Sequence, residues 1–157
     1  MSGTMNSNSL HLLAGHVDRE RLWRRHLEMA SIGATPLGGV HRLPFSKEDA
    51  ESRRVFLSWA HARGFGTEMD DFANIFVRRE GTERNLEPVV SGSHSDTQPN
   101  GGRFDGIYGV LAAFEALEAI DDAGIATRRP IEAVIWTAEE ADAAQSNPAR
   151  TAATAAT

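Results

Sequence analysis

PVVSGSHSDTQPNGGRFDGIYGV, residues 88–110, reads as a strand, then a loop, then the start of a helix. The apolar run at its beginning predicts a buried strand that ends at His94. Gly, Asn and Pro are frequent in residues 95–105, and they favour a loop. From Gly106 or Ile107 to about Asp121, large apolar residues recur at helical spacing and predict a strong helix. These residues are Val110, Leu111, Phe114, Leu117 and Ile120.

A second strand is predicted at Ile131–Trp136, directly after Pro130. It runs into Thr137-Ala138-Glu139-Glu140. Strands that alternate with helices predict an α/β fold in which helices cover the sheet faces. If the two strands are parallel, His94 and the Glu pair reach the same sheet edge, where open α/β sheets bind ligands.

The N-terminal half contains two further predicted helices and one strand. Apolar and charged residues mix from Leu10 to Ala30, which predicts a helix broken near Gly15. Ser46, with the acidic Asp49 three residues later, is close to a capping box and begins the next helix. We expect Gly64 to end that helix. A strand is predicted at Phe72–Val77, where the residues alternate and favour β structure.

The last part of the chain differs in composition. Residues 141–157 contain no Leu, Ile, Val or aromatic residue, so they can contribute little to a core. We therefore divide the chain into a catalytic-domain part, residues 1–140, and a tail, residues 141–157. The tail is expected to be disordered or a short, marginal helix.

Composition narrows the classes of function. The chain has 157 residues and a formal net charge of -6, which argues against nucleic acid or an anionic membrane as a partner. No apolar run is long enough for a membrane span, and the N-terminus does not resemble a secretory signal, so we expect a cytoplasmic protein. Because there is no Cys, any metal ion must be bound by His and carboxylate side chains.

Three groups of acidic and His residues could bind a metal ion or take part in catalysis, and each group also has a purely structural explanation. His94 and Asp96 could be a metal ligand and the carboxylate that orients its ring, or an incidental pair at a strand end. Asp105 could bridge two metal ions or simply cap the following helix. Glu139 and Glu140 could divide the roles of general base and metal ligand, or form a solvated pair at a helix start.

Three features become specific when they occur together and in this order. They are the string G-S-H-S-D-T-Q-P-N-G-G-R-F-D-G-I-Y-G-V, a helix, and a strand that ends in W-T-A-E-E. From about Leu22 to Glu140, the chain resembles the zinc-dependent amidase family of hydantoinases and carbamoylases. This family includes N-carbamoyl-L-amino acid hydrolase, allantoate amidohydrolase and yeast-type β-ureidopropionase, within the aminoacylase and carboxypeptidase-like metallopeptidases. The resemblance implies a partial three-layer zinc-peptidase-like catalytic domain, with an incomplete sheet and flanking helices.

The resemblance also implies a role for each matching residue. His94 and Glu140 each bind one of two divalent metal ions, and Asp105 bridges both. Glu139 is the general base, and Asp96 orients His94. The ions are expected to be zinc, with manganese, cobalt or nickel as alternatives. The implied substrates are small N-carbamoyl-L-amino acids or allantoate-like ureides, whose carbamoyl or ureido carbonyl is attacked by metal-activated water.

The match to this family is incomplete. Family members are much longer, carry two further His ligands downstream of the Glu pair, and form homodimers through an inserted dimerisation domain. None of the six His of this chain lies after His94, and Ala141 stands where the family continues with Gly. We therefore expect an N-terminal fragment, produced by a frameshift or a truncated gene, whose metal site is incomplete.

Two expectations follow from that interpretation. The isolated chain should hydrolyse no N-carbamoyl amino acid, and metal-dependent ammonia release by the purified chain would contradict this. Loss of strands and covering helices should leave Val134, Ile135 and Trp136 at an exposed sheet edge. The alternative function is a non-catalytic subunit that binds a partner chain supplying the missing His ligands.

Three loop residues near the motif are candidates for substrate contact. Gln98, Asn100 and Arg103 carry polar groups within the predicted loop. Shaping the loop, or facing solvent, explains them equally well.

Overall fold

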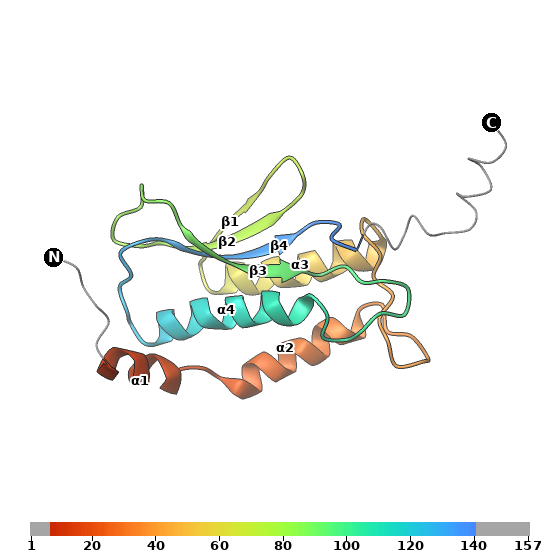
Figure 1. Ribbon diagram of the computed structural model, residues 1–157, viewed down its shortest axis with the longest axis horizontal. Coiled ribbons are helices and arrows are strands. Elements are labelled where there is room, and N and C mark those ends of the chain that lie inside the picture. Colours follow the sequence, from red (N-terminus) through yellow and green to blue (C-terminus); the bar gives the residue numbers. More distant parts are fainter. Residues whose placement is uncertain (1–6, 141–157) are drawn as a thin grey trace.

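Four strands form one mixed sheet in the order β1-β2-β4-β3 (Figure 1). The computed structural model describes residues 7–140. The strands are β1 (Gly66–Met69), β2 (Ile75–Arg79), β3 (Val89–His94) and β4 (Ile131–Trp136). The helices are α1 (Ser7–Gly15), α2 (Arg19–Ser31), α3 (Lys47–Ala62) and α4 (Ile107–Asp122). The predicted tail, residues 141–157, lies outside the described residues.

The two strands that end in candidate site residues are neighbours and run parallel. Val89 pairs with Ile131 at their beginnings, and His94 pairs with Trp136 at their ends. Helix α4 connects them and packs on both, as a crossover between parallel strands does. The condition set in the sequence analysis, that the two strands are parallel, is therefore met, and both strands deliver their C-terminal ends to one sheet edge. In contrast, β1 and β2 form an antiparallel pair, and β2 is antiparallel to β4.

Two predictions about strand burial are wrong. We predicted that residues 88–94 form a buried strand, but Val89 is 53% and Val90 43% exposed. The reason is that β3 is the last strand in the sheet order, with a partner on one side only. Conversely, β4 is an inner strand, so Val134 and Ile135 are buried and only Trp136 of the predicted exposed edge is exposed.

The core lies between one face of the sheet and the helices. Alternate residues of β2 and β4 face this core, and they join one apolar cluster with side chains of α2, α3 and α4. Figure 1 shows α4 against the sheet and α2 on the side of α4 away from it. The α/β class is therefore confirmed. Among the described residues, however, helices cover one sheet face, whereas the sequence predicted cover on both. The strand residues in the core are Ile75, Val77, Ala133 and Ile135.

Helix ends follow the predicted signals. The predicted N-terminal helix is broken, and α2 begins at Asp18, whose carboxylate accepts a hydrogen bond from the Arg21 backbone N–H. Ser46 caps α3 by accepting from the Asp49 N–H. Gly64 follows α3 with φ +70°, a conformation that favours glycine.

The strand predicted at Phe72–Val77 begins later than expected, because residues 70–74 form a turn held by the Asp70 carboxylate. Strand β1 was not predicted. All four of its residues are exposed, so it lacks the apolar alternation from which half-buried strands are recognised.

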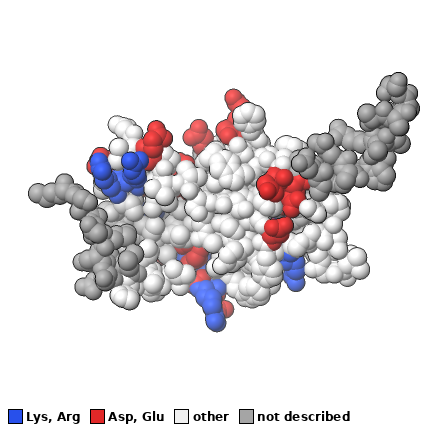
Figure 2. Space-filling view, in the orientation of Figure 1, with Lys and Arg blue, Asp and Glu red and all other residues white. Residues whose placement is uncertain are grey.

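Two surface properties bear on function. No helix within residues 7–140 is both long and apolar enough to span a membrane. In the view of Figure 2, acidic side chains gather at the end of the molecule where β4 terminates. That end is the sheet edge that carries His94 and the Glu pair.

Candidate metal centre

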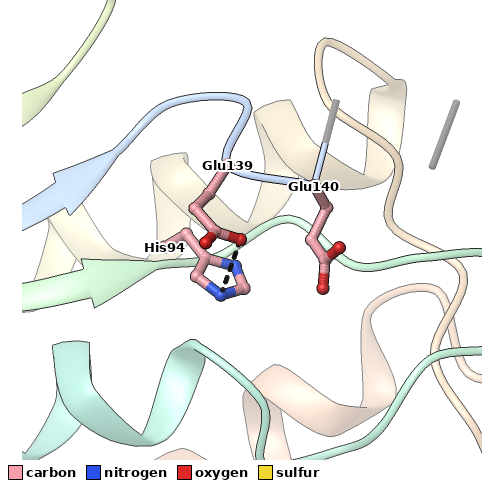
Figure 3. Close-up of side chains that lie close together, drawn as sticks. All are labelled: His94, Glu139 and Glu140. Atoms are coloured by element: carbon pink, nitrogen blue, oxygen red, sulfur yellow. Dashed lines mark ion pairs between the residues drawn. The ribbon is translucent and has the colours of Figure 1, made fainter. Parts of the chain in front are cut away.

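The ends of β3 and β4 bring His94, Glu139 and Glu140 together (Figure 3). One possible ligand atom from each of the three lies within 4.8 Å of the others. The His94 Nε2 atom is 3.5 Å from a Glu139 carboxylate oxygen. His94 is more than forty positions away from the two Glu residues in sequence, and the parallel register of β3 and β4 makes them neighbours.

The ring of His94 is held by the residue two positions later. Its Nδ1 atom is 3.0 Å from the backbone carbonyl oxygen of Asp96, and 3.8 Å from the nearer Asp96 carboxylate oxygen. A carbonyl oxygen can only accept, so Nδ1 carries the proton in this hydrogen bond. In the neutral ring, Nε2 then has a free lone pair that can bind a metal ion. The hydrogen bond from Asp96 to the ring is thus made by its backbone carbonyl and not by the carboxylate that was predicted to orient His94.

The carboxylate of Asp96 links the two strand ends. Asp96 is fully buried, and its Oδ2 atom accepts a 2.9 Å hydrogen bond from the Glu140 backbone N–H. Its Oδ1 atom, the one nearer His94, has no hydrogen-bond partner among the described residues. A buried carboxylate oxygen without a donor is costly, so its placement beside an imidazole is not explained by stability alone.

Gly106 lets the loop pack against the His94 ring. A Cβ atom on Gly106 would lie 2.3–2.5 Å from three ring atoms of His94. Asp105, the residue before it, is exposed in the turn that precedes α4 and is outside the group formed by His94, Glu139 and Glu140. Gly106 occupies the N-cap position of α4, with no side-chain cap bond. The alternative explanation of Asp105 as the helix cap is therefore wrong.

The three predicted loop residues have different surroundings. The Gln98 side-chain amide donates a 2.9 Å hydrogen bond to the Glu140 carboxylate, which places Gln98 at the candidate centre. The Asn100 side chain contacts the Thr35 hydroxyl, so it shapes the loop. Arg103 is exposed, and its charge acts on His26 of α2, whose pKa is lowered first by burial and second by Arg103.

A buried guanidinium supports the loop from below, and the sequence analysis missed it. Arg42 is 1% exposed and donates to the backbone carbonyls of Ser95, Met29 and Ile32 at 2.6, 2.8 and 3.0 Å. Burial lowers the pKa of Arg42, while the charges of Asp49 and Asp96 raise it. A single Arg in a loop has no distinguishing pattern, so no sequence signal marked it.

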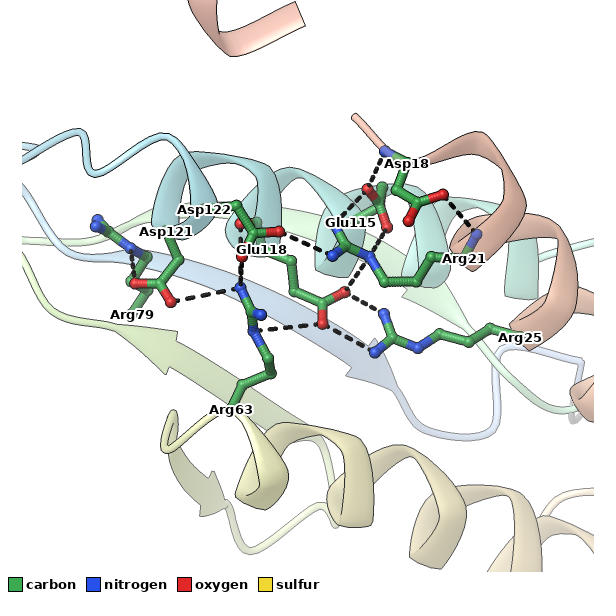
Figure 4. Close-up of polar contacts among 9 residues, drawn as sticks. All are labelled: Asp18, Arg21, Arg25, Arg63, Arg79, Glu115, Glu118, Asp121 and Asp122. Carbon is green, nitrogen blue, oxygen red and sulfur yellow. Dashed lines mark hydrogen bonds and ion pairs between the residues drawn. The ribbon is translucent and has the colours of Figure 1, made fainter. Parts of the chain in front are cut away.

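A second set of buried charges fixes α4, which follows Asp105 and Gly106 directly (Figure 4). Glu118 of α4 is 1% exposed and forms ion pairs with Arg21 and Arg25 of α2 and with Arg63. Arg21 also pairs with Glu115 at 2.7 Å. These contacts hold α2 and the end of α3 against α4, so the start of α4 is rigidly placed beside His94.

The grouped side chains suit a divalent metal ion. One neutral imidazole and two carboxylates are donors that zinc, manganese and cobalt accept. The donor types and the free Nε2 lone pair therefore fit a metal ion at this edge.

Comparisons with known proteins agree with this fold. Residues 90–154 match the model of Peptidase family M20/M25/M40. The N-carbamoyl-L-amino-acid amidohydrolase of Rhizobium meliloti is 44% identical over 124 residues, covering 79% of this chain and 30% of that protein. The allantoate amidohydrolase of Bacillus subtilis is 40% identical over 112 residues, covering 71% of this chain and 27% of that protein.

A solved structure leads to the same group of proteins. The crystal structure of a hydantoinase/carbamoylase family amidase from Burkholderia ambifaria matches with a TM-score of 0.77 and 49% sequence identity. The match covers 79% of this chain and 31% of that chain. The chain is thus similar to part of an M20-type domain, and it spans about 30% of the length of the curated relatives it matches.

Proposed function

We propose that this relative of the hydantoinase/carbamoylase family amidases contributes the first half of a metal-dependent centre that hydrolyses amide or ureido C–N bonds. The observation that carries the proposal is the meeting of His94, Glu139 and Glu140 at one sheet edge, with the Nε2 atom of His94 free to bind a metal ion. The names of the relatives, N-carbamoyl-L-amino-acid amidohydrolase and allantoate amidohydrolase, support the reaction class.

In this proposal, His94 and Glu140 bind metal and Asp105 is shared between two ions, with zinc the expected metal. A bound divalent ion lowers the pKa of water and polarises a carbonyl group. Gly106 packs on the His94 ring, and Asp105 is the residue directly before it. Because the chain spans about 30% of its relatives, further ligands are proposed to come from the rest of the whole protein.

The surroundings of the two Glu residues support different roles for them. Glu140 is anchored twice, through its N–H to Asp96 and through its carboxylate to Gln98, as suits a fixed ligand. The Glu139 side chain is 60% exposed, so its carboxylate is accessible to an attacking water molecule. Glu139 therefore accepts a proton from the attacking water and passes it to the leaving nitrogen.

The proposed substrates are small molecules that contain a ureido or carbamoyl group. N-carbamoyl amino acids and allantoate, which the relatives' names specify, share such a planar C–N group. Hydrolysis of this group releases ammonia, so activity can be followed without knowledge of the remaining part of the substrate.

Zinc titration calorimetry on the metal-free whole protein tests the metal site. His94→Ala and Glu140→Gln are expected to weaken zinc binding about 100-fold or more, because each removes a ligand. Glu139→Gln should bind zinc nearly as well as the unchanged chain. Glu51→Gln, which alters an exposed carboxylate on α3, is the control. Equal zinc affinities for the unchanged chain and His94→Ala would refute the assignment.

An ammonia-release assay on the whole protein tests the reaction. With N-carbamoyl-L-amino acids and allantoate as substrates, Glu139→Gln is expected to lower kcat about 10²–10⁴-fold, the usual contribution of a general base. Retained zinc binding with lost turnover would support the base assignment, and unchanged kcat would contradict it.

A further inference from the structure

Beneath the candidate metal centre, a chain of polar contacts runs from one strand end to the other through helix α3. Arg53 donates from Nε to the Asp49 carboxylate at 2.9 Å and from Nη1 to the Thr137 hydroxyl at 3.1 Å. The hydroxyl of Ser95 lies 3.4 Å from the same Asp49 oxygen. We call Ser95, Asp49, Arg53 and Thr137 the α3 bridge.

The ends of the α3 bridge are next to the candidate ligands. Ser95 stands between His94 and Asp96, and Thr137 is two residues before Glu139. Thr137 is fixed further, because its hydroxyl donates to the Ala73 carbonyl at 2.7 Å and its N–H donates to the Asn74 side chain at 2.8 Å. A shift of α3 relative to either end would therefore change the separation between His94 and the Glu pair.

Stability does not explain why charged residues occupy this place. Asp49 is 2% exposed, and Arg53 Nη2 is buried without a hydrogen-bond partner among the described residues. A buried ion pair pays a large desolvation cost, and apolar residues of similar volume often stabilise a fold as well or better. A guanidinium and a carboxylate form directional hydrogen bonds that link two chain segments, and apolar side chains cannot form such bonds.

The charges beneath the centre also balance. Arg42 and Arg53 are the cations, and Asp49 and Asp96 are the anions. Asp49 contacts Arg53 directly and also favours the charged form of Arg42, which holds the Ser95 carbonyl. Removal of Asp49 therefore weakens both supports of the segment that carries His94.

We propose that Asp49 and Arg53 are positioning residues that set the spacing between His94 and Glu139–Glu140, and so control metal affinity at this edge. The inference rests on the proposed function, because it explains how the residues of that same metal site are held at the right spacing. The three ligand atoms come within 4.8 Å of one another only while both strand ends are held. Neither residue touches a ligand atom of that group; both act through Ser95 and Thr137.

The first test compares zinc affinities by calorimetry. Arg53→Met and Asp49→Asn are expected to weaken zinc binding about 10–100-fold, the usual effect of removing support from metal ligands. Asn keeps an oxygen for the Phe45 N–H that Asp49 holds at the start of α3. Arg54→Met is the matched control, since Arg54 is the next residue on α3 and its side chain is 69% exposed in a pair with Glu51. Its zinc affinity should stay within about twofold.

Thr137→Val provides a milder variant, in case loss of a buried charge prevents folding. It removes the hydroxyl contacts with Arg53 and with the Ala73 carbonyl while keeping the shape of the side chain. It should weaken zinc binding about 2–10-fold, because only the Thr137 end of the α3 bridge is loosened.

The second test needs no metal and separates this inference from the proposed function. Hydrogen exchange of the Glu140 amide reports whether its bond to Asp96 stays closed. Exchange should be about tenfold faster in Arg53→Met and Thr137→Val, a loss comparable with one hydrogen bond, and unchanged in Arg54→Met. If the whole protein binds no zinc, the proposed function fails and this measurement alone decides the inference. Unaltered exchange together with unaltered zinc affinity would overturn it.

Discussion

Gly106→Ala is the substitution for which the structure predicts the most direct effect on the candidate metal centre. Gly106 has φ +65°, and its added Cβ would lie 2.3 Å from Cε1, 2.4 Å from Nδ1 and 2.5 Å from Nε2 of His94. Because ordinary contacts begin at 3.4 Å, the ring or the backbone must move by about 1 Å.

The expected cost has two parts. An L-residue in this left-handed region costs roughly 1–2 kcal/mol. Forcing a methyl group into a filled space costs roughly 1–3 kcal/mol more. Gly106→Ala should therefore lower the free energy of unfolding by about 2–5 kcal/mol, and the displaced Nε2 should weaken zinc binding about tenfold or more.

Urea denaturation measures the first effect and zinc titration calorimetry the second. Gly64→Ala separates the two parts, because Gly64 has φ +70° with nothing within 4 Å of the added Cβ. It should show the backbone cost alone and leave zinc binding unchanged. If Gly106→Ala destabilises the chain no more than Gly64→Ala and binds zinc equally well, the packing of Gly106 on His94 is refuted.

Three further predictions concern other parts of the molecule. Glu118→Ala should lower the free energy of unfolding by about 3–5 kcal/mol in urea denaturation, because Arg25 and its neighbours lose a buried partner, whereas the exposed Glu51→Ala should cost less than about 1 kcal/mol. Burial lowers the pKa of His26 below 6.5, so as the pH falls the His26 ring is protonated in the unfolded chain before it is protonated in the folded chain. The stability present above pH 6.5 is then lost as the pH falls below it, and melting temperatures should show a weaker dependence on pH in His26→Phe. Gln98→Ala should weaken zinc binding about 2–10-fold through the lost hydrogen bond to Glu140, and a normal zinc affinity with a raised KM would instead place Gln98 on the substrate.

Elements with a strong local pattern were predictable. Helix α4 carries apolar residues at helical spacing, and strand β4 contains four consecutive apolar residues, 133–136. The structure has both elements within a residue or two of the expected bounds. Burial of individual strands was not predictable, because it depends on the order of strands in the sheet. Residues 88–94 and 131–136 were both predicted to be strands, yet β3 is an edge strand and β4 an inner one.

The candidate site likewise has residues that could be predicted from the sequence and residues that could not. His94, Glu139 and Glu140 follow recognisable strand ends, so their convergence could be expected once the strands were taken as parallel. Arg42, Asp49 and Arg53 could not be recognised as its support, because the residues that they contact at the strand ends, Ser95 and Thr137, are far away in sequence. Asn100 and Arg103 lie in the same loop as Gln98, and only Gln98 contacts Glu140.

The sequence by itself determined that this protein is an α/β chain whose strands end in His and paired Glu residues, because residue spacing and turn-forming residues act locally. Its likeness to zinc-dependent amidases was also visible in residues 92–110 alone. Only the tertiary structure decided which strand ends lie side by side, that the Asp96 carbonyl holds the His94 ring, and that α3 connects both ends from below. Those contacts join residues about forty or more positions apart or depend on a turn, so they arise from packing rather than from local sequence.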